Sequence, residues 1–265
     1  MNAATQGNLD FYESFAPLYP AVYSLFDTGA IVAQWLRLLE QEGFVPKADR
    51  RDDEHLKLLD AACGPGNFLA AWAANGFEVT GVDYSPAMLR LAAIEWKRFR
   101  PLESCRLFRI NLCEPDSIGD LRESFDLAVS HSHLPNLFHP DDLPALFQSV
   151  SSCLRTGGSW VVDHSRIVAT LPVSQEHHSV SSTAQLLRIS DYDEVQRRCI
   201  QSWAGPDFRG REVYWFPELT DLDTIALQHQ LKLRRRVEWL PNRQAEPFRE
   251  VQASTERLLS IYGKV

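Results

Sequence analysis

Two strand-like runs near the beginning of the chain constrain the fold more than any other feature. The first, 56–62, is apolar and leads directly into a turn with two glycines that opens a helix. The second, 77–83, is followed by a helix whose start is marked by Ser85 as N-cap and Pro86 at the first helical position. Strands and helices in this order predict a βαβ unit and hence a parallel sheet.

The next part of the chain continues this alternation. Strands are predicted at 105–112, 125–132 and 159–164, with an amphipathic helix at 141–153 between the last two. We therefore expect an α/β fold: a Rossmann-like, doubly wound, seven-stranded, mostly parallel sheet with helices on both faces.

The pattern changes after the fifth strand, where short strand-like runs are separated by turns up to Phe216. This pattern of short runs and turns predicts an antiparallel β insertion that acts as a lid. A length of 265 residues suits a single elaborated domain. Its expected parts are a helical N-terminal cap, a core with the glycine turn, the β-rich lid and a return to the sheet: 1–45, 55–165, 170–216 and 217–265.

Composition excludes several function classes. The chain has 27 Lys and Arg against 35 Asp and Glu, a net charge of -8, which argues against binding to a nucleic acid. No apolar run approaches the length of a membrane span, and the first residues show no export signal. Five widely spaced cysteines without a CxxC pair indicate neither a disulfide framework nor a zinc site. We expect a cytoplasmic protein without a bound metal.

The glycine turn is the first candidate binding site. Gly64 and Gly66 lie where a strand becomes a helix, so backbone N–H groups can meet a polar ligand at close range. Asp83, at the end of the second strand, lies where an acidic side chain accepts hydrogen bonds from both hydroxyls of a ribose. A dinucleotide and S-adenosylmethionine both fit this architecture.

Two residues favour S-adenosylmethionine over a nicotinamide cofactor. A dinucleotide motif requires a third glycine at the position of Leu69. Asp60, on the strand before the turn, suits a cationic ligand instead, because its carboxylate can hold the α-ammonium of S-adenosylmethionine directly or through water.

The motifs 58–66 and 79–89 resemble those of class I S-adenosylmethionine-dependent methyltransferases. More narrowly, the runs at 133–135, 157–164 and 76–80 are similar to the glycine and sarcosine N-methyltransferase group, and the likeness covers nearly the whole chain.

This resemblance implies adenine contacts from Asn111 and Leu112, packing of Met88 on the adenine, and contact of Tyr12 and Tyr19 with the reaction chamber. The group has an arginine for the glycine carboxylate where this chain has Ser165, with Arg166 one place later. The predicted cofactor-binding residues are Tyr19, Asp60, Ala62, Gly64, Gly66, Asp83, Tyr84, Met88, Asn111, Leu112 and Ser130.

Three histidines follow strands at the carboxyl end of the sheet, where ligands bind in open α/β folds: His131, His133 and His164. An imidazole there can remove a proton from an amine or a hydroxyl, and the alternative for each is a structural hydrogen bond. We predict His133 and His164 as catalytic. The predicted substrate-binding residues are Tyr12, His131, Arg166 and Tyr214.

The sequence therefore predicts S-adenosylmethionine-dependent methyl transfer to a small molecule, most simply at an amine nitrogen. O- and C-methylation stay open because the same sheet hosts all three. So do a non-catalytic S-adenosylmethionine-binding protein and a homo-oligomeric assembly.

Overall fold

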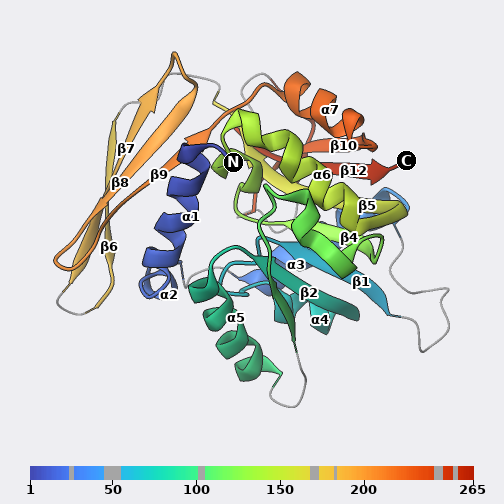
Figure 1. Cartoon of the computed structure of the whole chain (residues 1–265), viewed down its shortest axis with the longest axis horizontal. Coiled ribbons are helices and arrows are strands. Elements are labelled where there is room, and N and C mark those ends of the chain that lie inside the picture. The colour runs from blue at the N-terminus through green and yellow to red at the C-terminus, as the bar shows by residue number, and fades with distance from the viewer. Residues whose placement is uncertain are drawn as a thin grey trace.

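The larger of two β-sheets forms the centre of the molecule (Figure 1). The computed structural model describes residues 1–23, 27–44, 55–100, 105–167, 173–181, 184–241, 247–252 and 256–265. The central sheet has the strand order β11-β10-β12-β5-β4-β1-β2-β3. Its strands are β1 (Leu56–Ala61), β2 (Phe77–Asp83), β3 (Arg106–Arg109), β4 (Phe125–Ser130), β5 (Leu154–Ser165), β10 (Leu231–Trp239), β11 (Phe248–Arg249) and β12 (Arg257–Lys264).

The predicted α/β fold with a mostly parallel sheet is confirmed, but the predicted seven strands are eight. β1 to β5 pair in parallel, and β12 inserts antiparallel between β5 and β10. The additional strand is β11, which pairs with the end of β10 through Glu238 and Trp239. Two residues are too few to show a period-2 pattern, so β11 gave no signal in the sequence.

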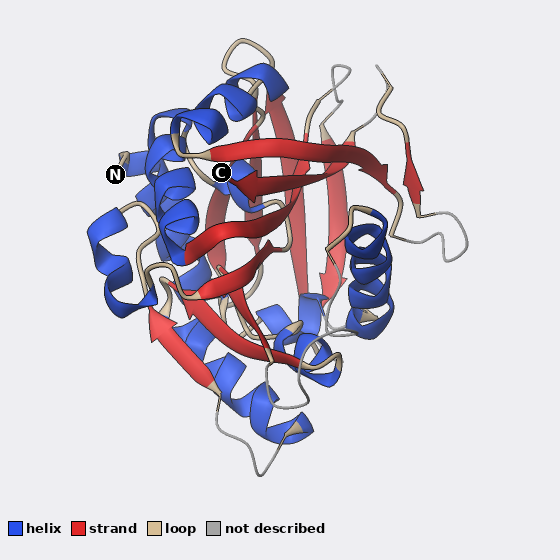
Figure 2. Ribbon diagram, turned by 90° about the vertical axis from the view of Figure 1, so that its right-hand side faces the viewer, coloured by secondary structure: helices blue, strands red, loops and turns tan. Residues whose placement is uncertain are grey.

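Helices cover both faces of the central sheet (Figure 2). On one face, α3 (Thr28–Gln41), α4 (Leu69–Ala74) and α5 (Pro86–Phe99) bury a core that includes Trp35, Trp72 and Trp96. On the other, α6 (Leu143–Cys153) and α7 (Leu219–Gln228) pack on residues such as Trp160 and Tyr262. No helix of the described ranges is long and apolar enough to cross a membrane.

The start of α5 follows the sequence signal. The hydroxyl of Ser85 accepts a hydrogen bond from the backbone N–H of Met88 at 3.0 Å, and Pro86 occupies the first turn. Three short 3₁₀ helices follow later in the described chain: η1 (Pro115–Leu121), η2 (Leu134–Leu137) and η3 (Pro140–Asp142).

A second, antiparallel sheet forms the lid, in the order β6-β7-β8-β9. Its strands are β6 (Ser174–Ser179), β7 (Gln185–Asp193), β8 (Arg198–Ala204) and β9 (Arg209–Trp215). The helix α1 (Ala3–Phe15) lies between the lid and the central sheet (Figure 1), and α2 (Tyr19–Tyr23) follows it. Phe11 and Phe15 of α1 pack against Leu186 and Trp203 of the lid.

The side chain of Asn8 joins α1 to two other elements. Its amide donates hydrogen bonds to the carbonyls of Leu137 at 2.6 Å and Val213 at 2.7 Å, and its oxygen accepts from the N–H of Val213 at 2.7 Å. Because Asn8 is buried, these bonds fix α1 against both the lid and the loop after β4.

Candidate active site

A cavity of about 510 Å³ lies between the carboxyl ends of β1, β2, β4 and β5, the N-terminal helices and the inner face of the lid. This is where ligands bind in open α/β folds. The predicted site residues that line it are Tyr12, Tyr19, Asp60, Ala62, Gly64, Asp83, Tyr84, Met88, Asn111, Leu112, His131, His133 and Tyr214.

Two predicted residues lie on the wrong face of the sheet. His164 is buried, and its Nε2 is 2.8 Å from the hydroxyl of Ser260. Ser130 is also buried and accepts a hydrogen bond from the indole of Trp160 at 3.0 Å. Neither lines the cavity, so the structure places both away from the site where His164 was predicted as catalytic and Ser130 as cofactor-binding. The physical reason is strand alternation: Asp163 faces the cavity, so its neighbour faces the opposite side.

The same alternation removes Arg166 from the site. Its guanidinium donates to the backbone carbonyl of Gln252, and it borders a separate, smaller pocket. Ser165 faces the main cavity instead. Arg166, predicted as substrate-binding, thus lies one position of register away from the residue that faces the cavity.

The two glycines of the turn have different functions. Gly64 lines the cavity with φ +54°, and its N–H donates to the carboxylate of Asp83 at 2.8 Å. Gly66, with φ +80°, does not line the cavity, and a Cβ there would lie 2.9 Å from the Cα of Ala92 on α5. The predicted cofactor contact of Gly66 is thus replaced by close packing of the turn on α5.

This difference gives a testable pair of variants. We expect Gly66→Ala to lower the free energy of unfolding by about 2 kcal/mol, because a side chain there meets backbone and needs a strained φ. Gly64→Ala also needs a positive φ but meets no atom within 4 Å, so it should cost less stability, about 1 kcal/mol, and should mainly weaken cofactor binding by blocking backbone approach. Chemical denaturation and calorimetry measure the two effects. Equal stability losses in both variants would contradict the assignment.

Asp83 is held for hydrogen bonding at the end of β2. Besides the N–H of Gly64, it accepts the N–H of Ser85 at 2.9 Å. Burial raises the pKa of Asp83 to about 6, while these backbone bonds oppose the rise. At neutral pH the carboxylate is therefore ionised, with lone pairs left for two ribose hydroxyls.

Asp60 tests whether the site fits a cationic ligand. Its side chain is buried, lines the cavity, and neither carboxylate oxygen has a hydrogen-bond partner among the described residues. Burial and the nearby charge of Asp83 raise its pKa to about 8. A buried carboxylate without a partner requires a positive group or a donor, which the α-ammonium of S-adenosylmethionine supplies. The residues present thus fit this cofactor.

The raised pKa of Asp60 predicts a pH dependence of cofactor affinity. Below about pH 8 the free protein holds Asp60 protonated, whereas an ammonium group binds the ionised form. The affinity for S-adenosylhomocysteine should therefore rise with pH, by about tenfold from pH 6 to pH 7. Calorimetry measures this slope. 5′-Methylthioadenosine, which lacks the ammonium group, should show only the shallow rise, about twofold from pH 6 to pH 7, that ionisation of Asp83 produces, and so should Asp60→Asn. A flat profile in the unaltered protein would contradict the contact.

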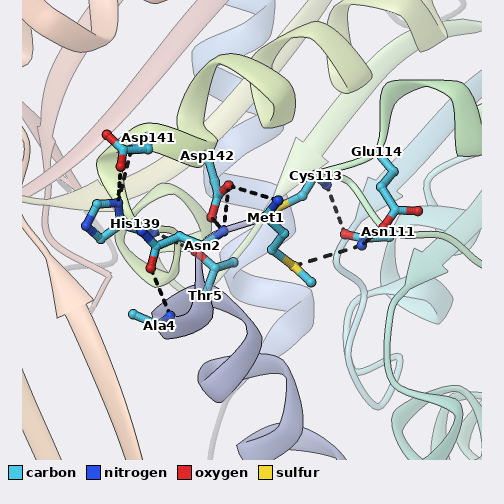
Figure 3. A network of polar contacts seen from close by, with 10 residues as sticks. All are labelled: Met1, Asn2, Ala4, Thr5, Asn111, Cys113, Glu114, His139, Asp141 and Asp142. Carbon is cyan, nitrogen blue, oxygen red and sulfur yellow. Dashed lines mark hydrogen bonds and ion pairs between the residues drawn. The ribbon is translucent and has the colours of Figure 1, made fainter.

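The loop that carries Asn111, the predicted adenine contact, lies beside a polar network that includes the start of α1 (Figure 3). The side-chain oxygen of Asn111 accepts from the N–H of Cys113 at 3.0 Å, and its amide donates to Glu114 at 2.8 Å. On the adjoining side, the carboxylate of Asp142 accepts the N–H of Asn2 at 2.9 Å. The side chain of Asn111 therefore shapes its own loop, and Leu112 also lines the cavity.

His133 is part of a charged group at the ends of β4, β5 and β12. Its Nδ1 is 3.3 Å from a carboxylate oxygen of Asp163 and 3.0 Å from the hydroxyl of Ser165. The guanidinium of Arg257 binds both oxygens of Asp163, at 2.8 and 3.3 Å, and lies 4.2 Å from the ring centre of Trp239. The Asp163 carboxylate thus lies between an imidazole and a guanidinium.

The charges set the protonation states. Burial alone would raise the pKa of Asp163, but His133 and Arg257 hold this pKa below its usual value. Burial lowers the pKa of His133, against the opposing effect of Asp163. At neutral pH, His133 is therefore uncharged, and a proton on Nδ1 pairs with Asp163. Nε2 is then the nitrogen with a free lone pair.

The backbone of His133 is strained. Ser132 and His133 have φ values of 60° and 62°, in the left-handed region that residues other than glycine rarely adopt. Such strain persists where the surrounding structure imposes it, and it is frequent at active sites. Here the left-handed residues lie directly after β4, where the imidazole of His133 meets Asp163 at the carboxyl edge of the sheet.

His131 has a different environment. Its ring stacks between Phe68 and Trp35, with centroids 3.7 and 4.1 Å away, and its Nε2 accepts the indole N–H of Trp72 at 3.2 Å. Burial lowers its pKa to about 3. It lines the cavity as a neutral, fixed wall.

Two tyrosines line the opposite wall of the cavity, and a buried glutamate binds both of their hydroxyls. The hydroxyls of Tyr12 and Tyr214 donate to the carboxylate of Glu212 at 2.8 and 3.2 Å, and the indole of Trp203 donates to it at 3.0 Å. Burial raises the pKa of Glu212, against these three hydrogen bonds. Because both phenol protons face Glu212, both phenol oxygens keep lone pairs for a donor in the cavity.

The sequence analysis missed Glu212 and Arg257 as site residues. Glu212 is two residues before Tyr214 on β9, so the two side chains share one face of the strand. This period of two is the one sequence signal that could have placed Glu212 near the cavity. Arg257 has no local signal: it reaches Asp163 because β12 pairs antiparallel with β5 and places Arg257 opposite Ser165.

The strand order is that of the class I fold of S-adenosylmethionine-dependent methyltransferases. The glycine turn, Asp83 and Asp60, which has no partner among the described residues, fit the cofactor of that class. Residues 58–158 match the family model described as a methyltransferase domain. This part of the chain is accordingly similar to a methyltransferase domain.

Curated relatives match part of the chain. Ubiquinone biosynthesis O-methyltransferase of Idiomarina loihiensis is 28% identical over 152 residues, which are 51% of this chain and 59% of the relative. Glycine N-methyltransferase of Oryctolagus cuniculus is 31% identical over 121 residues, 41% of this chain and 40% of the relative. The chain thus spans about half the length of these relatives.

A solved structure shows the same fold over nearly the whole chain. The S-adenosylmethionine-bound CalS10, an amino pentose methyltransferase from Micromonospora echinaspora, is 18% identical with a TM-score of 0.65. The alignment covers 93% of this chain and 96% of that one.

Proposed function

We propose that this chain transfers a methyl group from S-adenosylmethionine to an amine nitrogen of a small molecule. Asp60 and Asp83 would hold the ammonium and the ribose of the cofactor, with Gly64 at the turn. When bound, S-adenosylmethionine supplies an electrophilic methyl group on a sulfonium. The protein then has to position the acceptor in line with that methyl, exclude water and take up a proton.

His133 is the proposed proton acceptor. Its Nδ1 is occupied by Asp163 at 3.3 Å, which leaves Nε2 to remove a proton from the acceptor. Asp163 orients the imidazole and stabilises the positive charge that it gains, and Arg257 keeps Asp163 ionised.

The observation that carries the choice of an amine is the pair of phenol oxygens at Tyr12 and Tyr214. Both hydroxyls donate to the Glu212 carboxylate, so their oxygens keep lone pairs that can accept a hydrogen bond from a donor in the cavity. A primary or secondary ammonium that loses one proton to His133 keeps an N–H for these oxygens. An alcohol that loses its proton has none, and its negative oxygen would face lone pairs and a carboxylate.

Similarity to known proteins supports the same choice. Glycine N-methyltransferase and an amino pentose methyltransferase are among the proteins that this chain resembles. O-methylation is the second candidate, because one relative is a curated O-methyltransferase and a histidine paired with a carboxylate can also activate a hydroxyl.

The test is a set of primary amines, each with the alcohol of the same carbon skeleton, supplied with S-adenosylmethionine. We expect S-adenosylhomocysteine to form with amines and not with the matched alcohols, and mass spectrometry to place the methyl on nitrogen. Methylation of the alcohols alone would replace this proposal by the second candidate. Tight cofactor binding without turnover on either series would indicate a non-catalytic protein.

A further inference from the structure

The inner face of the lid forms a hydrogen-bonding wall that the methyl-transfer step does not use. Ser174, Ser190 and Gln201 line the cavity from β6, β7 and β8. The strand register places Ser174 opposite Ser190, and Ser190 opposite Gln201. Directly opposed residues of antiparallel strands point to the same face of a sheet. The three side chains therefore form one continuous polar row across the lid, which we call the lid row.

The lid row is uncharged, and the charges of the neighbouring Arg188 and Glu176 largely cancel each other. Arg188 also lines the cavity, and its guanidinium binds the carboxylate of Glu176 at 2.5 Å and lies 5.4 Å from the ring centre of Trp203. Glu176 offsets most of the charge of Arg188, and the Nε–H of Arg188, which is buried without a partner among the described residues, adds one hydrogen-bond donor to this wall. The part of the acceptor that meets the lid is therefore neutral.

Gln201 shows that this part is also polar. Its side-chain oxygen is buried and has no hydrogen-bond partner among the residues that the structure describes. A buried amide oxygen without a donor is costly, so a ligand group that donates a hydrogen bond there is favoured over an apolar one. The serine hydroxyls of the lid row can both donate and accept. A hydroxyl group on the acceptor matches this combination.

The lid row is next to the wall formed by Tyr12 and Tyr214, where the acceptor nitrogen is proposed to bind. Gln201 is opposite Glu212 on β9, and Glu212 holds Tyr12 and Tyr214. An acceptor whose nitrogen meets the two phenol oxygens thus presents its neighbouring atoms to Gln201 and Ser190.

We propose that the acceptor is a hydroxylated amine, with its nitrogen at Tyr12 and Tyr214 and its hydroxyl groups on Ser174, Ser190 and Gln201. This rests on the proposed methylation of an amine. It adds that the lid selects neutral, hydroxyl-bearing acceptors against apolar and carboxylate-bearing ones.

Three amines with one ring size test the selection: cyclohexylamine, a polyhydroxylated aminocyclitol and 4-aminocyclohexanecarboxylate. Calorimetry on the protein loaded with S-adenosylhomocysteine measures binding, and S-adenosylhomocysteine release measures turnover. The affinity of the aminocyclitol, and its kcat/KM for methylation, should each be about tenfold or more higher than those of the other two amines. The reason is that a site with polar groups rejects analogues that leave these groups unpaired. Equal or better binding of either other amine, or no binding of any, would overturn the proposal.

Variants of the lid row locate the effect. Gln201→Leu should raise KM for the aminocyclitol by about tenfold with little change in kcat and with no effect on cyclohexylamine, because it removes one hydrogen bond to the distal part of the acceptor. Ser190→Ala should act in the same direction. The matched control is Ser202→Ala, the exposed neighbour of Gln201 on the same strand, which points to the outer face. An equal effect of the control, or none of Gln201→Leu, would overturn the proposal.

Failure of this inference differs from failure of the proposed function. Selective binding of the aminocyclitol without methylation would contradict amine methylation and leave the hydroxyl selection standing. Methylation of all three amines at equal kcat/KM would support the function and overturn the lid row as its selector.

Discussion

Replacing His133 with asparagine is expected to lower kcat by about 100-fold or more, because the acceptor loses its general base. Asparagine can still donate to Asp163 from the place of Nδ1, so the geometry at the end of β4 should persist. The variant has no basic nitrogen in place of Nε2. Affinity for S-adenosylhomocysteine should not change, because Asp60 and Asp83 are untouched.

The pH profile separates loss of a base from loss of structure. In the unaltered protein, kcat should fall only when His133 becomes protonated. Because burial lowers the pKa of His133, this fall should lie below the ordinary histidine range near pH 6.5. The asparagine variant should lack this acidic limb.

His177→Ala is the control, since His177 is exposed on β6. Unchanged kcat in His133→Asn would remove His133 from the proton transfer and leave the methyl acceptor to lose its proton to water.

Replacing Asp83 with alanine is expected to raise the Kd for S-adenosylhomocysteine about 30- to 150-fold, or about 2–3 kcal/mol. The carboxylate has two functions that are lost together. It receives the N–H groups of Gly64 and Ser85, and it offers lone pairs to the ribose. Loss of the acceptor leaves two backbone donors without a partner and the ribose hydroxyls without a charged one.

Asp83→Asn and Glu78→Ala make this result specific. Asparagine keeps the size of Asp83 and one acceptor oxygen, so its Kd should lie between those of the unaltered protein and Asp83→Ala. Glu78 lies on the same strand and forms an exposed ion pair with Arg106, so its loss should leave Kd unchanged. An unaltered Kd in folded Asp83→Ala, shown by its thermal unfolding, would disprove the ribose contact.

The N-terminal helix connects the cofactor end of the cavity with the lid. Glu13 accepts the N–H of Ala87 at the start of α5, while Tyr12 donates to Glu212 of β9. A substrate that meets Tyr12 therefore contacts an element fixed on both sides, which is the pre-organised arrangement that positioning of a methyl acceptor requires.

Register explains why two predicted site residues lie away from the cavity. His164 and Arg166 stand next to Asp163 and Ser165 in the sequence, and a strand sends neighbours to opposite faces. The sequence placed the site at the end of this strand but did not specify the face. That choice depends on how β5 is packed between β4 and β12.

Local sequence alone determined the βαβ order, the glycine turn, and the acids Asp60 and Asp83, because residues that act within one strand and its following turn need only their neighbours. Tertiary structure decided which histidine faces the cavity, and it brought Arg257 to Asp163 and Glu212 to Tyr12. These partners lie 94 and 200 residues apart. Only the packing of β12 beside β5, and of the lid beside α1, brings such distant residues within hydrogen-bond distance.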